Sequence, residues 1–154
     1  MASQTVGQIM TAHPQCCAPQ DTIAAAARQM AVGNFGAVPV ADPQTRRLLG
    51  IITDRDITCR VTAEGADPTR TPVREGMTQD VAALGPEASL HDCMRLMEKR
   101  QVRRVPIVDD RGTVVGIVAQ ADLARATSQA HELEHQLAEL VEEVSAPQHV
   151  LTAG

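Results

Sequence analysis

Residues 50–56 read Gly-Ile-Ile-Thr-Asp-Arg-Asp, and residues 116–122 read Gly-Ile-Val-Ala-Gln-Ala-Asp. In both segments an apolar run gives way to a short stretch that ends in an aspartate. This change is typical of a buried strand that leads directly into a helix. The two segments are 66 residues apart. They indicate an internal repeat, and a repeat decides the architecture of a chain before any single motif does.

The repeat extends well beyond this motif. Towards the N-terminus the offset is 67 residues, so a deletion of one residue between the copies accounts for the change. Chance similarity would not keep register over most of two segments of about 60 residues. The matching pairs are Met10-Thr11 with Met77-Thr78, Pro19 with Pro86, Arg28 with Arg95, Met30 with Met97, and Val38-Pro39-Val40 with Val105-Pro106-Ile107.

Each unit has the predicted element order β-α-β-β-α. A short apolar stretch precedes the first helix, which Asp21 or Thr22 caps in the first unit and Ser89 caps in the second. Two apolar strands follow, joined by turn residues, and a second helix begins at Thr53 or Ala119. The predicted strands are residues 16–18, 37–41 and 48–52 in the first unit, and residues 81–84, 104–108 and 114–118 in the second.

The predicted fold class is therefore α+β, a mixed α/β arrangement. One unit of three short strands and two helices exposes too much apolar surface to stand alone, so we expect the two units to pack sheet to sheet about a pseudo-twofold axis. The predicted organisation is a first repeat at 6–62, a linker at 63–72, a second repeat at 73–127, a C-terminal helix at 128–146 and a flexible tail at 147–154.

The composition narrows the function classes. A net charge of −5 argues against a nucleic-acid-binding protein, which needs a basic surface. The chain has no run of about 18 apolar residues that could span a membrane, and its polar start lacks the apolar region of a signal peptide. We therefore expect a cytoplasmic protein. Phe35 is the only aromatic residue, so a bound base would lie in an aliphatic slot.

Four cysteines occur, at positions 16, 17, 59 and 93, and none forms a C-x-x-C pair. We interpret them as small hydrophobic residues. Redox activity of the adjacent Cys16-Cys17 pair is the alternative, which adjacency alone supports only weakly.

The first candidate binding site follows the first buried strand. Thr53 falls at the N-cap of a helix and Asp56 at its third position. Unpaired backbone N–H groups at a helix start attract anions such as phosphate, the Thr53 hydroxyl can add a hydrogen bond, and Asp56 can accept bonds from two sugar hydroxyls. The alternative is an ordinary capping pattern. The second unit keeps the acid, Asp122, without a cap hydroxyl, which favours a ligand, although stabilisation by the helix dipole also explains an isolated acid.

Arg103 and Arg104 form the second candidate. They precede a buried strand of the second unit, where the first unit has Gly36-Ala37. The arginine fork of donors suits phosphate. If the two units face each other, either arginine could reach a phosphate held at Thr53. The alternative is a solvated pair of charges.

These motifs and their twofold spacing resemble the CBS domain family, over about residues 6–127. The resemblance is greatest to small bacterial members with two repeats. It implies a regulatory module without a catalytic centre. Two clefts between the repeats would bind adenosine derivatives such as AMP, ADP, ATP, NAD or S-adenosylmethionine. Such modules pair into flat homodimers of four repeats and signal through an effector protein.

The resemblance also implies roles for individual residues. Thr53, within the same motif as Arg55, would contact phosphate and Asp56 the ribose hydroxyls. Arg103 and Arg104 would contact phosphate across the interface. The resemblance also assigns residues to the adenine slot, mainly through their backbone, and to the lining of the second cleft. The slot is formed by Ala37, Val38 and Pro39 with Thr11 and Ala12, and the second cleft by Asp122 with Arg104 and Val105, where Ala119 departs from the usual Ser or Thr.

The C-terminal segment contains His131-Glu132-Leu133-Glu134-His135, which matches the zinc protease motif H-E-x-x-H. The chain that follows is too short to build a substrate cleft, and its last histidine, His149, lies near a proline in the terminus. An apolar stripe explains the segment better and predicts packing against the module or against a second subunit. The stripe consists of Ala126, Ala130, Leu133, Leu137, Leu140 and Val144.

Three functions follow from this reading. The first is an adenine-nucleotide sensor that acts through a partner, without binding nucleic acid or membrane. The second is a ligand-free scaffold or dimerisation module. The third, a zinc hydrolase built on His131, Glu132 and His135, has the least support.

Overall fold

Two β-hairpins form the centre of the fold. In the computed structural model, which describes residues 4–145, β2 (Ala37–Ala41) pairs antiparallel with β3 (Leu48–Thr53), and β4 (Arg104–Val108) pairs antiparallel with β5 (Val114–Ala119). The two hairpins are equivalent down to an irregularity in register near the end of β2 and of β4. The predicted mixed α/β fold of two repeated units is confirmed.

The first long helix of each unit begins and ends in the same way. Thr22 caps α2 (Ile23–Gly33), and Ser89 caps α5 (Leu90–Arg100), each by accepting a hydrogen bond from a backbone N–H three residues on. Both helices end at a residue in the left-handed conformation, Asn34 and Gln101. Local sequence therefore fixes both ends of these helices.

The two hairpins meet at equivalent residues. Arg47 forms a bridge with Thr113, and the two positions are related by the repeat offset of 66. Around this bridge the Leu48 N–H donates to the Gly112 carbonyl at 2.9 Å, and the Val114 N–H donates to the Arg46 carbonyl at 3.0 Å. Residues related by a twofold axis lie opposite one another where they approach that axis. The predicted pseudo-twofold axis therefore passes close to this bridge.

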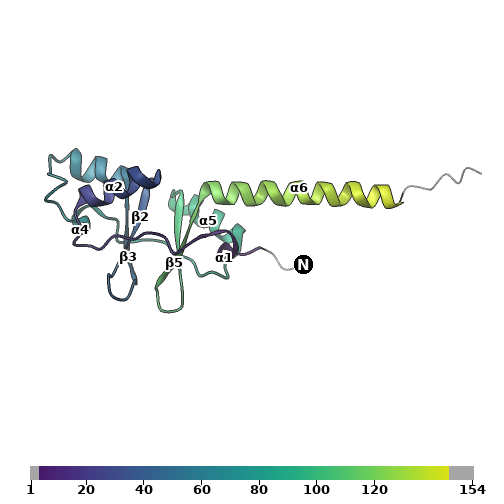
Figure 1. The fold of residues 1–154 in the computed structure, drawn as a ribbon, viewed down its shortest axis with the longest axis horizontal. Helices are drawn as coiled ribbons and strands as arrows, with labels where there is room; N and C mark the ends of the chain where they lie inside the picture. The colour runs from purple at the N-terminus through teal and green to yellow at the C-terminus, as the bar shows by residue number, and fades with distance from the viewer. Residues whose placement is uncertain (1–3, 146–154) are drawn as a thin grey trace, which may run out of the picture.

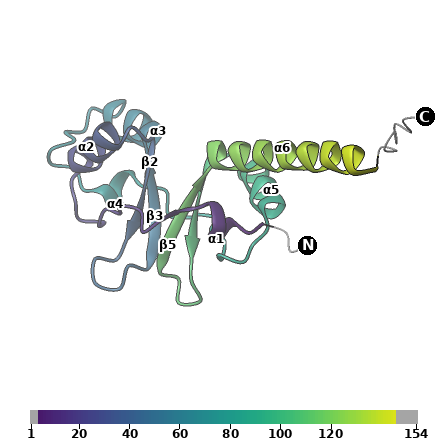
Figure 2. The ribbon, with the colours of Figure 1, turned by 45° about the vertical axis from the view of Figure 1, so that its right-hand side comes forward.

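The start of each repeat crosses to the other unit. The short helix α1 (Val6–Ile9) and β1 (Thr11–Ala12) lie on the second unit, where β1 pairs with β5. The equivalent helix α4 (Val73–Gly76) lies on the first unit. Figures 1 and 2 show this exchange, with α1 beside α5 and α4 beside α2. The two halves of the molecule therefore do not coincide with the two repeats of the sequence.

Each hydrophobic core contains residues from both repeats. Val73 and Met77, from the second repeat, are buried in the core of the first half, and Val6, from the first repeat, is buried in the core of the second half. The other buried members are Cys17, Ile23, Ala26, Met30, Val38, Val40, Ile52 and Val61 in the first core, and Cys93, Met97, Val105, Ile107, Val118 and Leu123 in the second.

Some predicted elements differ from the observed ones. The apolar stretches at 16–18 and 81–84 are not strands, because each makes only one parallel bridge, Cys17 with Val40 and Leu84 with Ile107. After β3 a single turn of helix, α3 (Asp54–Asp56), continues as the π-helix η1 (Ile57–Thr62).

The last helix is continuous, which differs from the predicted boundary between a repeat helix and a separate C-terminal helix. α6 runs without a break over Gln120–Ser145. It leaves the rest of the molecule and projects from it (Figure 1). The predicted tail at 147–154 lies outside the described residues. Within residues 4–145 no helix is long and apolar enough to cross a membrane.

Candidate functional site

A cleft of about 640 Å³ opens where the first hairpin faces the second half of the molecule. The first half contributes Ala37, Thr53 and Arg55 to its walls, and the second half contributes Arg103 and Arg104. All five were singled out from the sequence. The antiparallel register sets Ala37 directly opposite Thr53, and the pseudo-twofold packing brings the start of β4 to the same place. The cleft therefore lies between the two halves.

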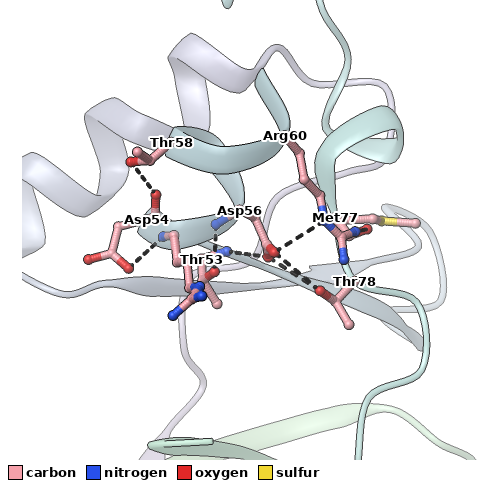
Figure 3. Close-up of polar contacts among 8 residues, drawn as sticks. Thr53, Asp54, Asp56, Thr58, Arg60, Met77 and Thr78 are labelled. Carbon is pink, nitrogen blue, oxygen red and sulfur yellow. Dashed lines mark hydrogen bonds and ion pairs between the residues drawn. The ribbon is translucent and has the colours of Figure 1, made fainter. Parts of the chain in front are cut away.

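Thr53 and Asp56 hold each other at the start of α3. The Asp56 N–H donates to the Thr53 hydroxyl oxygen at 3.0 Å, and the Thr53 N–H donates to the Asp56 carboxylate at 3.0 Å (Figure 3). This is a reciprocal capping box, the structural role that the sequence left open. The Thr53 hydroxyl can still donate a hydrogen bond to a ligand, because its oxygen acts only as an acceptor in the box.

Asp56 is not among the residues that line the cleft, and its carboxylate has further polar neighbours. The Thr78 hydroxyl lies 3.4 Å from both carboxylate oxygens, and the Arg60 Nε lies 3.7 Å from Oδ1 (Figure 3). Arg60 also donates to the Met77 carbonyl at 3.1 Å. Thr78 lines the cleft and was not selected from the sequence. Its equivalence to Thr11 was the only available signal.

Basic residues outnumber acidic residues in the cleft. Its lining includes four arginines, at positions 55, 100, 103 and 104, and two aspartates, at positions 54 and 80. Arg100 is paired with Asp80 at 3.2 Å. Within residues 4–145 none of the other three arginines lies within ion-pair distance of a carboxylate. An anion in this cleft would therefore meet three arginines outside ion-pair distance of any carboxylate of the described chain, with Asp54 as the one acidic side chain of the lining that is not in an ion pair.

Gly36 lets the two halves approach each other at this point. A Cβ on Gly36 would lie 3.0 Å from Asp54 Oδ2 and 3.3 Å from Arg104 Nη1. The guanidinium of Arg104, from the second half, therefore reaches over the backbone of the first half. The side-chain ends of Asp54 and Arg104 occupy the space that a larger residue at position 36 would need.

The structure corrects the prediction that Thr11 and Ala12 lie in the same slot as Ala37. They do not line this cleft, because β1 crosses to the second half, where Thr11 pairs with Ile117 and Ala12 with Gly116. Residues 78 and 80–82 of the second repeat occupy the corresponding place. The side chains of Val38, Pro39 and Val105 are fully buried, so only the backbone at these positions could face a ligand.

The equivalent helix start in the second half is only partly similar. Asp122 accepts a hydrogen bond from the Ala119 N–H at 2.8 Å, as Asp56 does from Thr53, but Ala119 has no hydroxyl to return the bond. Asp122 also forms an ion pair with Arg125. A groove of about 690 Å³ lies nearby between α5 and α6, but neither Ala119 nor Asp122 lines it. The second cleft stays a prediction.

The histidines of the H-E-x-x-H segment lie on the exposed part of α6. His131 and His135 contact Glu134 and Glu139 of the same helix at 3.9 Å and 3.4 Å. Within the described part of the chain no three His, Cys, Asp or Glu side chains are grouped as a metal site.

The fold and the cleft define a class of protein, a tandem-repeat module with a ligand-sized cleft between its halves. The CBS domain family matches residues 6–62 and 73–129, and the chain belongs to this family. A pair of CBS domains is a regulatory module, and proteins of this kind are generally regulatory rather than catalytic.

Two curated relatives cover most of the chain. The CBS domain-containing protein YhcV of Bacillus subtilis is 43% identical over 120 residues, which cover 78% of this chain and 83% of YhcV. Hypoxic response protein 1 of Mycobacterium tuberculosis is 34% identical over 143 residues, which cover 93% of this chain and 95% of that protein.

Solved structures share the fold. Hypoxic response protein I with two coordinated zinc ions has a TM-score of 0.72 and 36% identity, and covers 79% of this chain and 98% of its own. The CBS domain pair of MJ0100, in complex with 5′-methylthioadenosine and S-adenosyl-L-methionine, has a TM-score of 0.75 and 27% identity, over 84% of this chain and 99% of its own. CBSX2 in complex with AMP has a TM-score of 0.74 and 24% identity, and covers 84% of this chain and 99% of its own.

Proposed function

We propose that this protein is a sensor that binds a phosphorylated adenosine nucleotide in the cleft between its halves. The observation that carries the proposal is the convergence of three unpaired arginines, Arg55, Arg103 and Arg104, on the capped helix start at Thr53. The adenosine compounds held by the CBS pair of MJ0100 support the choice of an adenosine ligand.

Each part of a nucleotide has a matching surface. The phosphates lie among the arginines and accept a hydrogen bond from the Thr53 hydroxyl. The ribose lies beside Thr78, which lines the cleft and contacts Asp56 at 3.4 Å. Asp56 does not itself line the cleft, and its carboxylate would accept from the ribose hydroxyls once this contact is displaced. The base lies against aliphatic side chains, because the cleft has no aromatic residue to stack on. The aliphatic lining consists of Ala37, Ile51, Val81, Ala82 and Val102.

The charge of the cleft selects among adenosine derivatives. A nucleotide carries negative charge on its phosphates, whereas S-adenosylmethionine carries a positive sulfonium group. Three unpaired arginines attract the former and repel the latter, and the interaction is strengthened in a partly enclosed cleft where the effective dielectric constant is lower than in water. The order of affinity expected is ATP, then AMP, then S-adenosylmethionine.

The position of the cleft also explains how binding is transmitted. Because the ligand would contact both halves, it stabilises one relative position of the halves over others. A change of this kind acts on another protein in the cytoplasm or on a second subunit, and the nucleotide is sensed rather than consumed. The module is proposed to work as a homodimer that passes the signal to an effector.

Calorimetry tests the proposal. ATP should bind the wild-type protein, and Arg104→Gln should weaken binding by roughly tenfold or more, since a hydrogen bond to a charged group contributes about 1.5–3 kcal/mol. Arg111→Gln is the matched control, because Arg111 is exposed and does not line the cleft. Absence of heat with ATP, AMP, NAD and S-adenosylmethionine alike would favour the ligand-free scaffold.

A further inference from the structure

The outer part of α6 has no partner within the described chain. From Thr127 to Glu142 every residue is exposed, and the helix runs away from the module (Figures 1 and 2). Four large apolar side chains on it are open to solvent. Their exposed fractions are 57% for Leu133, 45% for Leu137, 56% for Leu140 and 62% for Val141.

These side chains form one stripe, the α6 stripe, which consists of Ala130, Leu133, Leu137, Leu140 and Val141. Alternating steps of three and four residues place Ala130, Leu133, Leu137 and Leu140 on one face of a helix, and Val141 lies beside them, four residues after Leu137. The same spacing leads back to Ala126 and Leu123, which are buried against the module. The α6 stripe therefore lies on the same face of α6 as Leu123 and Ala126, which pack against the module.

The outer part of α6 lacks the packing that stabilises most helices. Most helices in proteins are stabilised by packing of an apolar face rather than by intrinsic propensity. The last turn of α6 has no basic residue to interact with the negative end of the helix dipole. Packing of the α6 stripe against another surface would therefore stabilise this part of the helix.

The charge distribution indicates what that surface is. Every lysine and arginine lies at or before Arg125, and all five acidic residues that follow are glutamates of α6, so this segment accounts for the whole net charge of −5. At helical spacing, Glu132, Glu139 and Glu142 lie on the face opposite the α6 stripe. The flanks of the stripe are mostly uncharged, with Thr127, Gln129 and Gln136. A basic partner would be attracted to the glutamates on the face opposite the stripe. The stripe itself, which is apolar with mostly uncharged flanks, is complementary to another apolar stripe of the same kind.

We propose that the α6 stripe pairs with the α6 stripe of a second copy of this chain, with the two helices antiparallel. The antiparallel orientation follows from the position of the module at the start of α6. Leu123 and Ala126 face the module on the same side as the stripe, so a parallel partner would bring a second module into the space of the first. With Leu137 opposite the partner's Leu140, Glu134 lies near the partner's Val141 rather than near another glutamate. The overlap is about three helical turns, which makes this a weak, concentration-dependent contact.

Sedimentation at several protein concentrations tests the pairing. Leu137→Glu places a charge in the stripe, and His135→Glu places one on the opposite face as the matched control. The particle mass of Leu137→Glu should be half that of the wild type and of His135→Glu at high concentration. Equal masses for all three proteins, or a wild type that stays monomeric at every concentration, would overturn the proposal.

Small-angle X-ray scattering tests the orientation. Antiparallel helices place the two modules at opposite ends of the pair, so the wild-type protein at high concentration should give a two-lobed distance distribution. Leu137→Glu should lose the second lobe and keep the thermal melting temperature of the module, because Leu137 belongs to neither core. A compact, single-lobed wild-type particle of doubled mass would contradict the antiparallel arrangement.

Discussion

Cys17 lies in the core of the first half, with its thiol directed at the Pro39 carbonyl at 3.9 Å. Burial, with the charges of Asp21 and Cys16 nearby, raises the pKa of the Cys17 thiol to about 12. Burial also raises the pKa values of Cys16 and Cys93. Because the thiolate is the reactive form, these environments argue against a redox role for the Cys16-Cys17 pair. Cys17 is a core residue, whereas Cys16 is half-buried at its edge.

The raised pKa of Cys17 predicts a loss of stability in alkali. The unfolded chain releases this proton near pH 9, whereas the folded chain keeps it until about pH 12, so the contribution to stability is complete below pH 9 and is lost as the pH rises towards 12. The free energy of unfolding in urea, measured at pH 8, 9 and 10, should therefore fall with pH. Cys17→Ala should reduce the slope, and Cys59→Ala, at an exposed position, should not.

Among the candidate site residues, the capping arrangement of Thr53 and Asp56 is set by local order along the chain. Thr53 and Asp56 could be predicted because a strand end, a cap and an acid three residues later are neighbours along the chain. Thr78 could not, because it reaches Asp56 only after its segment crosses to the other half. Thr11 was assigned to the wrong place for the same reason. The sequence of a crossing segment is compatible with either half, and only the packing decides between them.

Among the elements, the crossing segments impose a narrow requirement on the strands beneath them. A Cβ on Gly50 would lie 2.7 Å from the Thr78 carbonyl oxygen and 3.1 Å from Met77 Sδ. The equivalent Gly116 has Met10 in the same relation, with its Sδ at 2.2 Å from such a Cβ. Glycine lets the crossing backbone lie directly on the hairpin and form its hydrogen bonds with Ile51.

Gly50→Ala should destabilise the protein by about 1–3 kcal/mol, because a backbone carbonyl cannot move aside as a flexible side chain can. This cost exceeds the gain of about 0.4–1 kcal/mol from a stiffer unfolded chain. Gly36→Ala is the control, since its Cβ meets the flexible ends of Asp54 and Arg104, and its effect should be within about 0.5 kcal/mol. Urea unfolding without ligand measures both. Equal midpoints for the two variants would contradict the close approach.

The elements that periodicity predicted well are the four strands of the hairpins and the two capped helices. Apolar runs bounded by turn residues and clear caps define them locally. The stretches at 16–18 and 81–84 were predicted as strands on apolar character, but each is held by only one bridge. The start of α6 gives no reason for a break near residue 127, because no proline or glycine occurs between Gln120 and Ser145.

At the scale of the whole molecule, the exchange of α1 and α4 makes each half depend on the other repeat. Neither repeat of the sequence holds a complete core, because Val6 and Val73 each complete the core of the opposite half. A ligand proposed to bind between the halves would therefore act on two parts that share their cores. This connection favours small shifts of one half relative to the other over separation of the two.

The exchange predicts which half of the molecule a core substitution destabilises, and the prediction is the opposite of the one expected from the order of the sequence. Val6→Ala should open the second half of the molecule, although Val6 belongs to the first repeat, because its side chain is fully buried in that core. Loss of about 2 kcal/mol of packing corresponds to roughly 30-fold faster amide hydrogen exchange in β4 and β5. Val73→Ala should have the same effect in β2 and β3, and Val32→Ala, at a position that is 89% exposed, should change neither. Faster exchange in β2 and β3 after Val6→Ala, with β4 and β5 unchanged, would place α1 on its own repeat and contradict the exchanged fold.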